Sequence, residues 1–473
     1  MPSLHNNSAI ALDLGTTSIK AGLLERQGDL ANIVIRHAPK IDLNGGHYES
    51  DALAYAETAE QLLDECITRA GECKSLGICS QRSSFMVWEQ ATGMPLTALI
   101  SWQDNRGAAS CEALRTHEST IRSLSGLPLT PYYFAPKLRV LLQDNPEWLA
   151  RLEHGELRAG TLDTFLIWRL TGGRHFVTDA SMAARTQLMD IRQQGWSAQL
   201  CQLFGIPSGI LPEIKTSAGM GLQLNNGLVL QASMGDQSAA LLASVSEGQP
   251  EALVNLGTGC FVIRYLPDGV AAPNDYLQTL VYQDSARHVH LAIEGTLNSI
   301  AASLAPYPVE RCRVEDLAAD DIYCLAEPSG LGAPYFRGDI GVRFSQPTEQ
   351  LTQRHIAALL VEAVIFRVAR ILEEFHRECA IERVFLSGGL SALTCLQQGI
   401  AECVPFEVHH LRQSESSLKG AALLAVGMNT DSHRNSVRIQ SAENPALRKK
   451  YYGWKLWLND LLSGASEGKV VSL

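Results

Sequence analysis

The sequence predicts a two-domain α/β protein with mixed sheets flanked by helices, and three observations lead to this class. A 13-residue pattern occurs twice, as LDLGTTSIKAGLL from Leu12 and as VNLGTGCFVIRYL from Val254. In both copies an apolar strand runs into Leu-Gly-Thr and a second apolar strand follows, which indicates a hairpin with a tight glycine turn. Hairpins are followed by alternating helix and strand patterns, and 473 residues are too many for one ordinary core. We therefore expect two related domains, over residues 1–240 and 241–473.

The periodicity of apolar residues places the individual elements. In the first half, strands are predicted over residues 10–14, 18–24, 33–38, 75–80 and 228–233, with helices over 50–70 and directly after Gln237. In the second half, helices are predicted over residues 353–379 and 418–427, and a strand over 384–386. The tail from Asn429 is polar and is expected to be only partly ordered.

The composition restricts the class of partner and the compartment. A net charge of -11 and a pI near 5.7 argue against a nucleic-acid or anionic-membrane surface, because such surfaces need clustered Lys and Arg. Eleven cysteines are scattered without a C-x-x-C pair, which is typical of reduced thiols rather than of disulfides or a zinc site. The N-terminus has no charged region before its short apolar stretch, so we expect a cytoplasmic protein.

The first repeated turn is a candidate phosphate site. Gly15, Thr16, Thr17 and Lys20 offer backbone N–H groups, hydroxyls and a positive charge, which can hold a nucleotide phosphate. Asp13 can contribute a negative charge to a phosphate-bound cation, whereas the second copy has Asn255 at this position. The difference predicts one working nucleotide site, although the turn by itself is also compatible with an ordinary glycine hairpin.

Three side chains are candidates for substrate chemistry. Asp236 lies in Gly-Asp-Gln between a strand and a helix, where its carboxylate could take a proton from a hydroxyl or cap the helix. Arg82 and Trp102 each follow a predicted strand among polar residues, which suits a polyhydroxylated ligand. A buried tryptophan beside a surface ion pair is the alternative interpretation.

The order of motifs resembles the FGGY family of carbohydrate kinases, and within it the glycerol kinases most. The matching segments are ALDLGTTSIKAGLL, GICSQRSSFMVWEQATGMPLTALISWQDNR, TLDTFLIWRLTGG, HFVTDASMAARTQLMD, MGDQSAALLA, VNLGTGCF, GLGAPYF and FLSGGL. The resemblance implies an actin-like ATPase fold, also called ribonuclease H-like, with nucleotide bound in an interdomain cleft. It implies transfer of the ATP γ-phosphoryl group to a hydroxyl of a small polyol or sugar, with Mg²⁺, and a homodimer is one candidate assembly.

The resemblance also assigns roles to residues of this sequence. It makes Asp236 the general base, and Asp13 and Asp236 the carboxylates near magnesium. The substrate would be bound by Arg82, Trp102, Tyr132, Asp236, Gln237 and Phe261, in the N-terminal domain except for Phe261. The nucleotide would be bound by Gly15, Thr16, Thr17, Lys20, Gly257, Thr258, Gly259, Gly332, Gly388 and Gly389, with the C-terminal domain on the nucleotide side.

Departures from the glycerol kinase pattern raise doubts about glycerol as the substrate. Glycerol kinases have Gln-Arg-Glu where this chain has Gln-Arg followed by Ser83. Losing that carboxylate costs about 1 to 3 kcal/mol of hydroxyl binding, so we expect a substrate larger than glycerol. Leu393 replaces an asparagine near the adenine, and the prolines in residues 305–308 should interrupt a helix.

Three alternatives to a glycerol kinase-like enzyme remain open at this stage. One is a ketose or pentulose kinase, and another is a catalytically weak sugar-binding regulator with the same fold. The replacement at Leu393 favours the regulator, whereas the presence of both Asp13 and Asp236 favours an enzyme. An actin-like filament or chaperone ATPase would need neither Asp236 nor the pair of Arg82 and Trp102.

Overall fold

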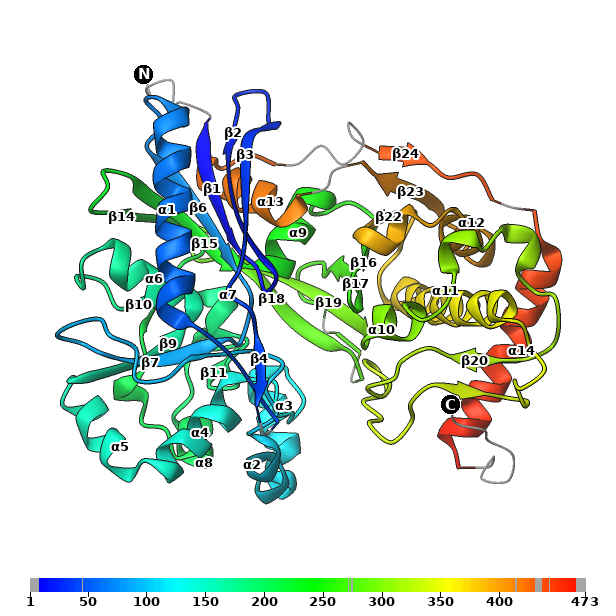
Figure 1. The fold of residues 1–473 in the computed structure, drawn as a ribbon, viewed down its shortest axis with the longest axis horizontal. Coiled ribbons are helices and arrows are strands. Elements are labelled where there is room, and N and C mark those ends of the chain that lie inside the picture. The colour runs from blue at the N-terminus through cyan, green and yellow to red at the C-terminus, as the bar shows by residue number, and fades with distance from the viewer. Residues whose placement is uncertain are drawn as a thin grey trace. The chain divides into compact units, whose positions relative to one another are not determined.

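The computed structural model describes residues 8–44, 46–270, 272–273, 275–412, 415–429, 436–441 and 443–464. The chain forms two compact units, each made of more than one segment (Figure 1). Unit 1 contains residues 1–243, 279–291 and 415–430, and unit 2 contains residues 244–278, 292–414 and 431–473.

Unit 1 is built on a six-stranded sheet with the order β14-β15-β6-β1-β2-β3 in the described part of the chain. Its strands are β14 (Ala218–Gln223), β15 (Val229–Gly235), β6 (Ser75–Ser80), β1 (Ala9–Leu14), β2 (Ser18–Leu24) and β3 (Leu30–His37). Strand β1 is antiparallel to β2 and parallel to β6, and β6 is parallel to β15. The sheet is therefore mixed, as predicted.

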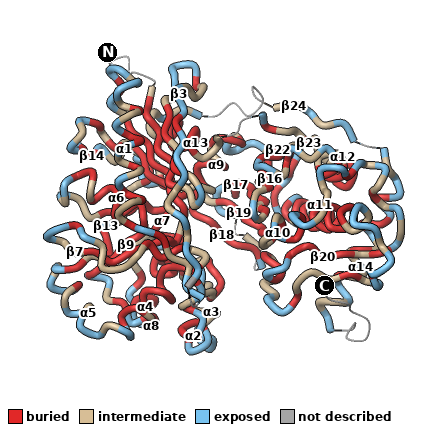
Figure 2. Tube along the Cα trace, in the orientation of Figure 1, coloured by how far each residue is buried: buried red, intermediate tan, exposed pale blue. Residues whose placement is uncertain are grey.

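Helices α1 (Ala52–Ala70) and α13 (Ser416–Val426) cover this sheet on opposite faces. Alternate residues of a strand point to opposite faces, so Ile10 and Leu12 pack with α1, while Ala9 and Ala11 pack with α13. The central strands are accordingly buried on both sides, as the red trace in Figure 2 shows. The predicted helices at 50–70 and 418–427 are confirmed within two residues.

Close packing of α13 depends on two glycines. A Cβ on Gly77 of β6 would lie 2.1 Å from the carbonyl oxygen of Ala421, and a Cβ on Gly420 would lie 1.9 Å from that of Ala239. Only glycine allows backbones to approach this closely. Small residues thus bring a helix from near the end of the chain onto the N-terminal sheet, an assignment that the sequence analysis did not anticipate.

The remainder of unit 1 has a second sheet with the order β4-β5-β8-β7-β9. Its strands are β4 (Asp42–Asn44), β5 (His47–Ser50), β8 (Leu99–Ile100), β7 (Phe85–Glu89) and β9 (Leu157–Thr161). The other helices of unit 1 are α2 (Ala108–Ala113), α3 (Glu118–Ser125), α4 (Phe134–Asp144), α5 (Pro146–Glu153), α6 (Leu162–Leu170), α7 (Ala180–Ala183) and α8 (Ala198–Phe204). Short strand pairs are formed by β10 (Val177–Asp179) with β13 (Glu213–Lys215) and by β11 (Met189–Asp190) with β12 (Gly195–Trp196).

Unit 2 repeats the core topology of unit 1. Its sheet has the order β18-β19-β17-β16-β22-β23-β24, with β18 (Leu277–Gln283), β19 (Val289–Leu297), β17 (Cys260–Tyr265), β16 (Glu251–Leu256), β22 (Arg383–Ser387), β23 (Glu407–Leu411) and β24 (Ser436–Arg438). Residues 279–283 of β18 and 289–291 of β19 are part of unit 1. Strand β16 is antiparallel to β17 and parallel to β22, just as β1 is with β2 and β6. The 13-residue repeat in the sequence is therefore a repeat in the structure.

A short strand pair in unit 2 is formed by β20 (Cys324–Leu325) and β21 (Arg343–Phe344). Helices complete the unit. They are α10 (Ile300–Leu304), α11 (Gln353–Glu378), α12 (Thr394–Cys403) and α14 (Pro445–Leu462), while α9 (Asp236–Ser244) ends where unit 2 begins. Helix α10 stops at Leu304, immediately before the predicted interruption at 305–308.

Within the tail that was expected to be only partly ordered, residues 445–462 form the 18-residue helix α14, which the sequence analysis did not predict. Its face of Leu447, Tyr451, Trp454 and Leu458 is buried, at helical spacing. The Trp454 indole donates to the carbonyl oxygen of Cys324 at 2.8 Å. The many polar residues of the tail concealed this apolar stripe; the predicted tail at 430–435, 442 and 465–473 lies outside the described residues.

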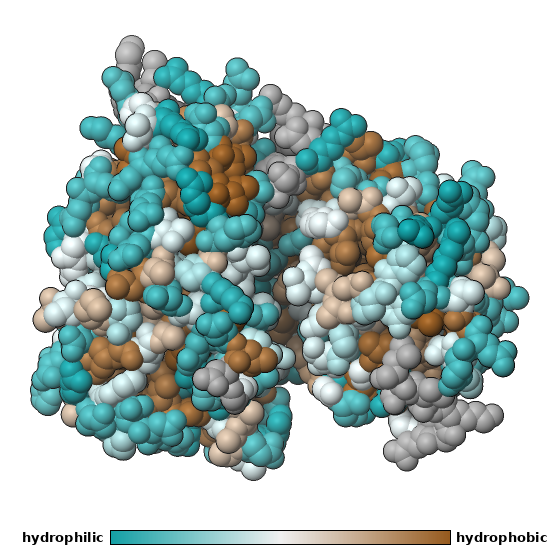
Figure 3. Space-filling model, in the orientation of Figure 1, coloured by the Kyte–Doolittle hydropathy of each residue, from teal (hydrophilic) through white to brown (hydrophobic). Residues whose placement is uncertain are grey.

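The surface of the described chain is mostly polar, and the face in Figure 3 is largely hydrophilic with scattered apolar patches. None of the described helices is both long enough and apolar enough to cross a bilayer. All eleven cysteines are buried, Cys260 included, where burial raises the pKa of its thiol.

Candidate active site

The ends of three parallel strands bring the candidate residues of unit 1 together. Leu14 at the end of β1 is level with Ser80 at the end of β6, and Ser80 is level with Gly235 at the end of β15. The residues that follow these strands therefore emerge at one edge of the sheet, where ligands of α/β proteins commonly bind. They are the Gly15 turn, the Gln81–Arg82 segment and Asp236.

Asp236 and Arg82 meet at this edge. The Arg82 Nε atom lies 3.7 Å from Asp236 Oδ1, and the side chains are 10% and 25% exposed. Asp236 begins α9, and its Oδ1 accepts from the N–H of Gln237 at 2.7 Å. Gly235 makes room for Arg82, because a Cβ there would lie 3.0 Å from Arg82 Cδ. Asp236 is thus the first residue of α9, and its Oδ1 atom also faces the positively charged guanidinium of Arg82.

The phosphate turn is hydrogen-bonded to a residue predicted for the substrate. The Trp102 indole N–H donates to Thr16 Oγ1 at 3.1 Å, and Thr16 in turn donates to Gln81 Oε1 at 3.3 Å. The Gly15 carbonyl oxygen accepts from the Tyr55 hydroxyl at 2.7 Å. The two predicted subsites of unit 1 therefore share one hydrogen-bond network.

Asp13 lies on the α13 face of β1, opposite Lys20 and next to Cys79 in register. Burial raises the pKa of its carboxyl to about 7, and the negative charge of Asp236 adds to the shift. Among the described residues, no hydrogen-bond partner is found for its buried Oδ1 atom. A buried acceptor without a donor is costly, and a cation would satisfy it.

Lys20, which is predicted to bind a nucleotide phosphate, forms an ion pair in the structure. Its ammonium is 2.5 Å from a carboxylate oxygen of Glu415, next to the start of α13. Thr17 is exposed and offers its carbonyl oxygen to the N–H of Ala38 at 3.0 Å. Tyr132 is 39% exposed just before α4, and Gln237 is half-buried in the first turn of α9.

In unit 2 the second turn has the geometry that its glycines predict. The N–H of Gly257 donates to the carbonyl oxygen of Gly259 at 2.8 Å, so Thr258 sits exposed at the tip. Phe261 follows on β17, half-buried and level with Asn255.

The Gly388–Gly389 pair follows the end of β22 in unit 2. Gly388 has a φ of +87°, and a Cβ there would lie 2.4 Å from the Leu256 carbonyl oxygen, so this position requires glycine. Leu393 is half-buried at the start of α12 and makes no side-chain capping hydrogen bond.

A buried ion pair that the sequence analysis missed supports the Gly332 turn. Arg367 Nε lies 2.8 Å from Glu327 Oε1, and both side chains are 1% exposed. Glu327 Oε2 accepts from the N–H of Gly332 at 2.9 Å, and a Cβ on Gly332 would lie 2.3 Å from Thr296 Oγ1. The available signal was an arginine in the middle of the apolar helix at 353–379.

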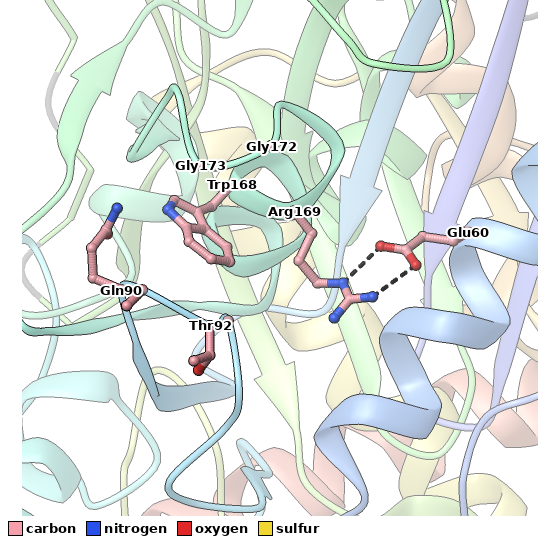
Figure 4. Close-up of a pocket in the computed structure, with 9 residues that line it drawn as sticks. Glu60, Gln90, Thr92, Trp168, Arg169, Gly172 and Gly173 are labelled. Atoms are coloured by element: carbon pink, nitrogen blue, oxygen red, sulfur yellow. Dashed lines mark hydrogen bonds and ion pairs between the residues drawn. The ribbon is translucent and has the colours of Figure 1, made fainter.

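Unit 1 also has a surface depression of about 350 Å³ that contains none of the predicted site residues. It is lined by Glu60, Gln90, Ala91, Thr92, Gly93, Trp168, Arg169, Gly172 and Gly173. Figure 4 shows the Arg169 guanidinium paired with the Glu60 carboxylate, at 2.7 and 2.9 Å. The charges on this wall therefore neutralise each other.

Comparison with known proteins identifies the family. Residues 8–237 match the N-terminal domain of the FGGY family of carbohydrate kinases, and residues 252–428 match its C-terminal domain. The chain belongs to the FGGY family of carbohydrate kinases.

The FGGY kinase is similar to several named relatives. A glycerol kinase of Xanthobacter autotrophicus is 31% identical over 445 residues, covering 88% of this chain and 89% of that protein. The crystal structure of Plasmodium falciparum glycerol kinase with ADP superimposes with a TM-score of 0.84 at 22% identity, covering 96% and 97% of the two chains. A ligand-bound xylulose kinase from Lactobacillus acidophilus gives a TM-score of 0.78 at 18% identity, covering 97% and 99%.

Membership confirms the predicted fold class and enzyme class. FGGY kinases use ATP as phosphate donor and act on carbohydrates, so this chain is a phosphotransferase with an alcohol group as acceptor. Its substrate is a small carbohydrate, and the geometry of unit 1 bears on which one.

Proposed function

We propose that this FGGY kinase transfers the γ-phosphoryl group of ATP to a hydroxyl of a polyol or sugar larger than glycerol. The observation that supports the proposal most is the meeting of Asp236 and Arg82 at 3.7 Å, at the strand edge that also carries the Gly15 turn. Phosphoryl transfer needs little covalent help from the protein, so placement of one hydroxyl beside a carboxylate provides much of the catalysis.

Asp236 is the proposed general base. Its partly exposed carboxylate can accept the proton of the attacking hydroxyl, and Arg82 holds that carboxylate in place. Arg82, Trp102, Tyr132 and Gln237 of unit 1 would bind the other hydroxyls and the carbon skeleton, and Phe261 of unit 2 is the sixth proposed substrate residue. We keep the proposal of two domains, with residues 1–240 on the substrate side and residues 241–473 on the nucleotide side.

The nucleotide is proposed to contact the glycine turns. In unit 1 these contacts are Gly15, Thr16, Thr17 and Lys20, and in unit 2 they are Gly257, Thr258, Gly259, Gly332, Gly388 and Gly389. Lys20 would have to exchange Glu415 for a phosphate, since the two side chains are paired in the structure.

Asp13 fits a magnesium ion carried by ATP. The buried Oδ1 of Asp13 lacks a partner among the described residues, and the negative charge of Asp236 contributes to the raised pKa of Asp13. A divalent cation would satisfy the unpaired oxygen and would also neutralise the repulsion between the two carboxylates. Within the described chain no group of three or more His, Cys, Asp or Glu side chains could hold a metal alone. Magnesium bound by one or two carboxylates plus phosphates, with Asp13 and Asp236 as the protein ligands, would neutralise charge on the phosphates.

Ser83 supports a substrate other than glycerol. Its hydroxyl donates to the carbonyl oxygen of Arg185 at 3.1 Å, and the side chain is buried next to Arg82. A serine here offers less acceptor capacity and occupies less volume than a glutamate. A ketose or pentulose kinase is the alternative within the family. Cytoplasmic location and a homodimer stay predictions.

The test is ATP consumption across a panel of polyols, ketoses and aldoses, with Asp236→Asn as the matched variant. We expect a substrate larger than glycerol to have the highest kcat/KM, and Asp236→Asn to lower its kcat by at least about 100-fold with the fold retained. Glycerol ranking first would contradict the size argument. Near-native turnover by the variant would remove Asp236 from the role of base.

A further inference from the structure

Lys137 in helix α4 is fully buried, which is unusual for a lysine. Its ammonium donates to two main-chain carbonyl oxygens, that of Ser101 at 2.8 Å and that of Ser83 at 3.1 Å. It also lies 5.7 Å from the centre of the Phe85 ring. Both hydrogen-bond acceptors are thus neutral groups of the backbone.

Burying this amine without a contacting carboxylate is costly. Burial lowers the pKa of Lys137 to about 7, a shift that Asp104 only partly offsets. If the side chain at this position only had to fill space, methionine or leucine could do so at a lower free-energy cost of burial. The amine therefore has a function that an apolar side chain could not supply. It donates to the carbonyl oxygen of Ser83, and it is a second donor to the carbonyl oxygen of Ser101, which also accepts from the N–H of Asp104 at 3.1 Å.

The two carbonyl groups belong to the segments that carry proposed substrate residues. Ser83 directly follows Arg82, and Ser101 directly precedes Trp102. The helix that carries Lys137 begins two residues after Tyr132. One side chain thus connects three segments that are far apart in sequence and that each supply a proposed contact to the polyol.

The segment at Ser83 has a backbone conformation that needs outside support. Ser83 has a φ of +65°, in the left-handed region that non-glycine residues rarely adopt. Next to it, Ser84 Oγ accepts from the N–H of Trp102 at 2.9 Å and donates to Gln81 Oε1 at 2.8 Å. If the Ser83 carbonyl group changed its orientation, the backbone on both sides of it would move, and Arg82 and Trp102 would therefore shift together.

We propose that Lys137 is a positioning residue that fixes the backbone of the Arg82 and Trp102 segments in the geometry that binds the polyol. The inference rests on the proposed function, because it assumes that these two side chains contact the substrate. Lys137 itself is buried beneath them and does not touch the substrate or the phosphates.

The experiment compares Lys137→Met, Lys137→Arg and the wild type, with Lys450→Met as matched control. Lys450 is also a buried lysine, but it lies in unit 2 and pairs with Glu362 at 2.6 Å and with Asp320 at 3.0 Å. Steady-state kinetics measure KM and kcat for the best polyol and for ATP, calorimetry measures the Kd of that polyol without turnover, and thermal unfolding measures stability.

We expect Lys137→Met to raise the polyol KM and Kd at least tenfold, while the ATP KM changes less than twofold and kcat less than threefold. Lys137→Arg, which restores N–H donors, should recover most of the polyol affinity, and Lys450→Met should lower stability without changing the polyol KM.

Wild-type polyol affinity in folded Lys137→Met, or an arginine variant no better than the methionine variant, would overturn the inference. Failure of both variants to fold would also overturn it, because Lys137 would then be a purely structural residue. Absence of polyol binding and turnover in the wild type would instead refute the proposed function, and this inference with it.

Discussion

At the scale of single residues, Ser83 is the position where this chain departs most clearly from a glycerol site. Ser83→Glu should raise kcat/KM for glycerol about tenfold or more, because a carboxylate can accept from two substrate hydroxyls and such bonds are worth about 1 to 3 kcal/mol. The Ser83 side chain is buried, and a glutamate there would place a larger, charged group in the same space, so some loss of stability should accompany the gain.

Ser83→Ala is the control for this substitution, since it removes the hydroxyl without adding a carboxylate. Both variants are measured on glycerol and on the best wild-type substrate. Equal glycerol kinetics in the two variants would show that this position does not select the polyol.

Asp13 gives a second prediction at this scale. Burial raises its pKa to about 7, so the carboxyl is partly protonated near neutral pH, whereas a magnesium ligand must be deprotonated. Binding of MgATP should therefore release a proton from Asp13, more at pH 6.5 than at pH 8.5. The released fraction falls as pH rises, because the carboxyl has already lost its proton above its pKa.

Calorimetry in two buffers with different ionisation enthalpies measures this proton release. Asp13→Asn is the matched variant, and subtracting its result removes the protons that ATP itself exchanges. An identical release in wild type and Asp13→Asn would mean that Asp13 is not deprotonated by the bound nucleotide and metal.

At the scale of elements, α13 tests whether close packing by glycine is required. In an isolated helix Gly→Ala is favourable by about 1 kcal/mol. A Cβ on Gly420 would instead lie 1.9 Å from the carbonyl oxygen of Ala239 in α9. The backbone of α13 or of α9 would have to move to accommodate it. We expect Gly420→Ala to destabilise the protein by about 2 kcal/mol or more, by overpacking, and to lower kcat because Asp236 begins α9.

Gly209→Ala is the control, since no atom lies within 4 Å of the added Cβ and the residue is outside the left-handed region. Its free energy of unfolding in urea should stay within about 0.5 kcal/mol of the wild type. A Gly420→Ala variant as stable as this control would show that the helix and its neighbour adjust without cost.

The elements also show what the sequence could and could not predict. Strands β2 and β6 were predicted to the residue, because apolar runs bounded by glycine and polar residues mark their ends. Asp13 was proposed as a site residue because the second copy of the repeat has Asn255 at its position, and Arg82 and Asp236 were proposed because each follows a predicted strand. Local patterns identified these positions, and the parallel pairing of the strands brought them together.

Other features were missed because they depend on contacts distant in sequence. A lysine in a helix is usually solvated, so Lys137 gave no sign that its amine would reach the carbonyl groups of Ser83 and Ser101. The ion pair of Lys20 could not be predicted from the sequence, because its partner Glu415 is 395 residues away. Helix α13 was predicted correctly, yet its place on the N-terminal sheet was not.

At the scale of the whole molecule, the discontinuous make-up of unit 1 leads to a prediction about where the chain can be cut. Residues 415–430 belong to unit 1 and supply the helix that covers β1, β6 and β15. Without that helix, Ala9, Ala11, Cys79, Ala232 and Met234 would be exposed to water. Burial of apolar surface is the main term that favours folding, so the loss should be severe.

A fragment of residues 1–243 should therefore be partly unfolded or aggregated, although it contains the whole N-terminal family match. A second fragment, in which residues 415–430 follow residue 243 through a flexible Gly-Ser linker, should regain a cooperative thermal transition and lose binding of a hydrophobic dye. Both fragments lack residues 279–291 equally, so the comparison isolates α13. A fragment of residues 1–243 that unfolds cooperatively, with the same midpoint as the linked version, would show that α13 is dispensable and that the N-terminal sheet buries its own face.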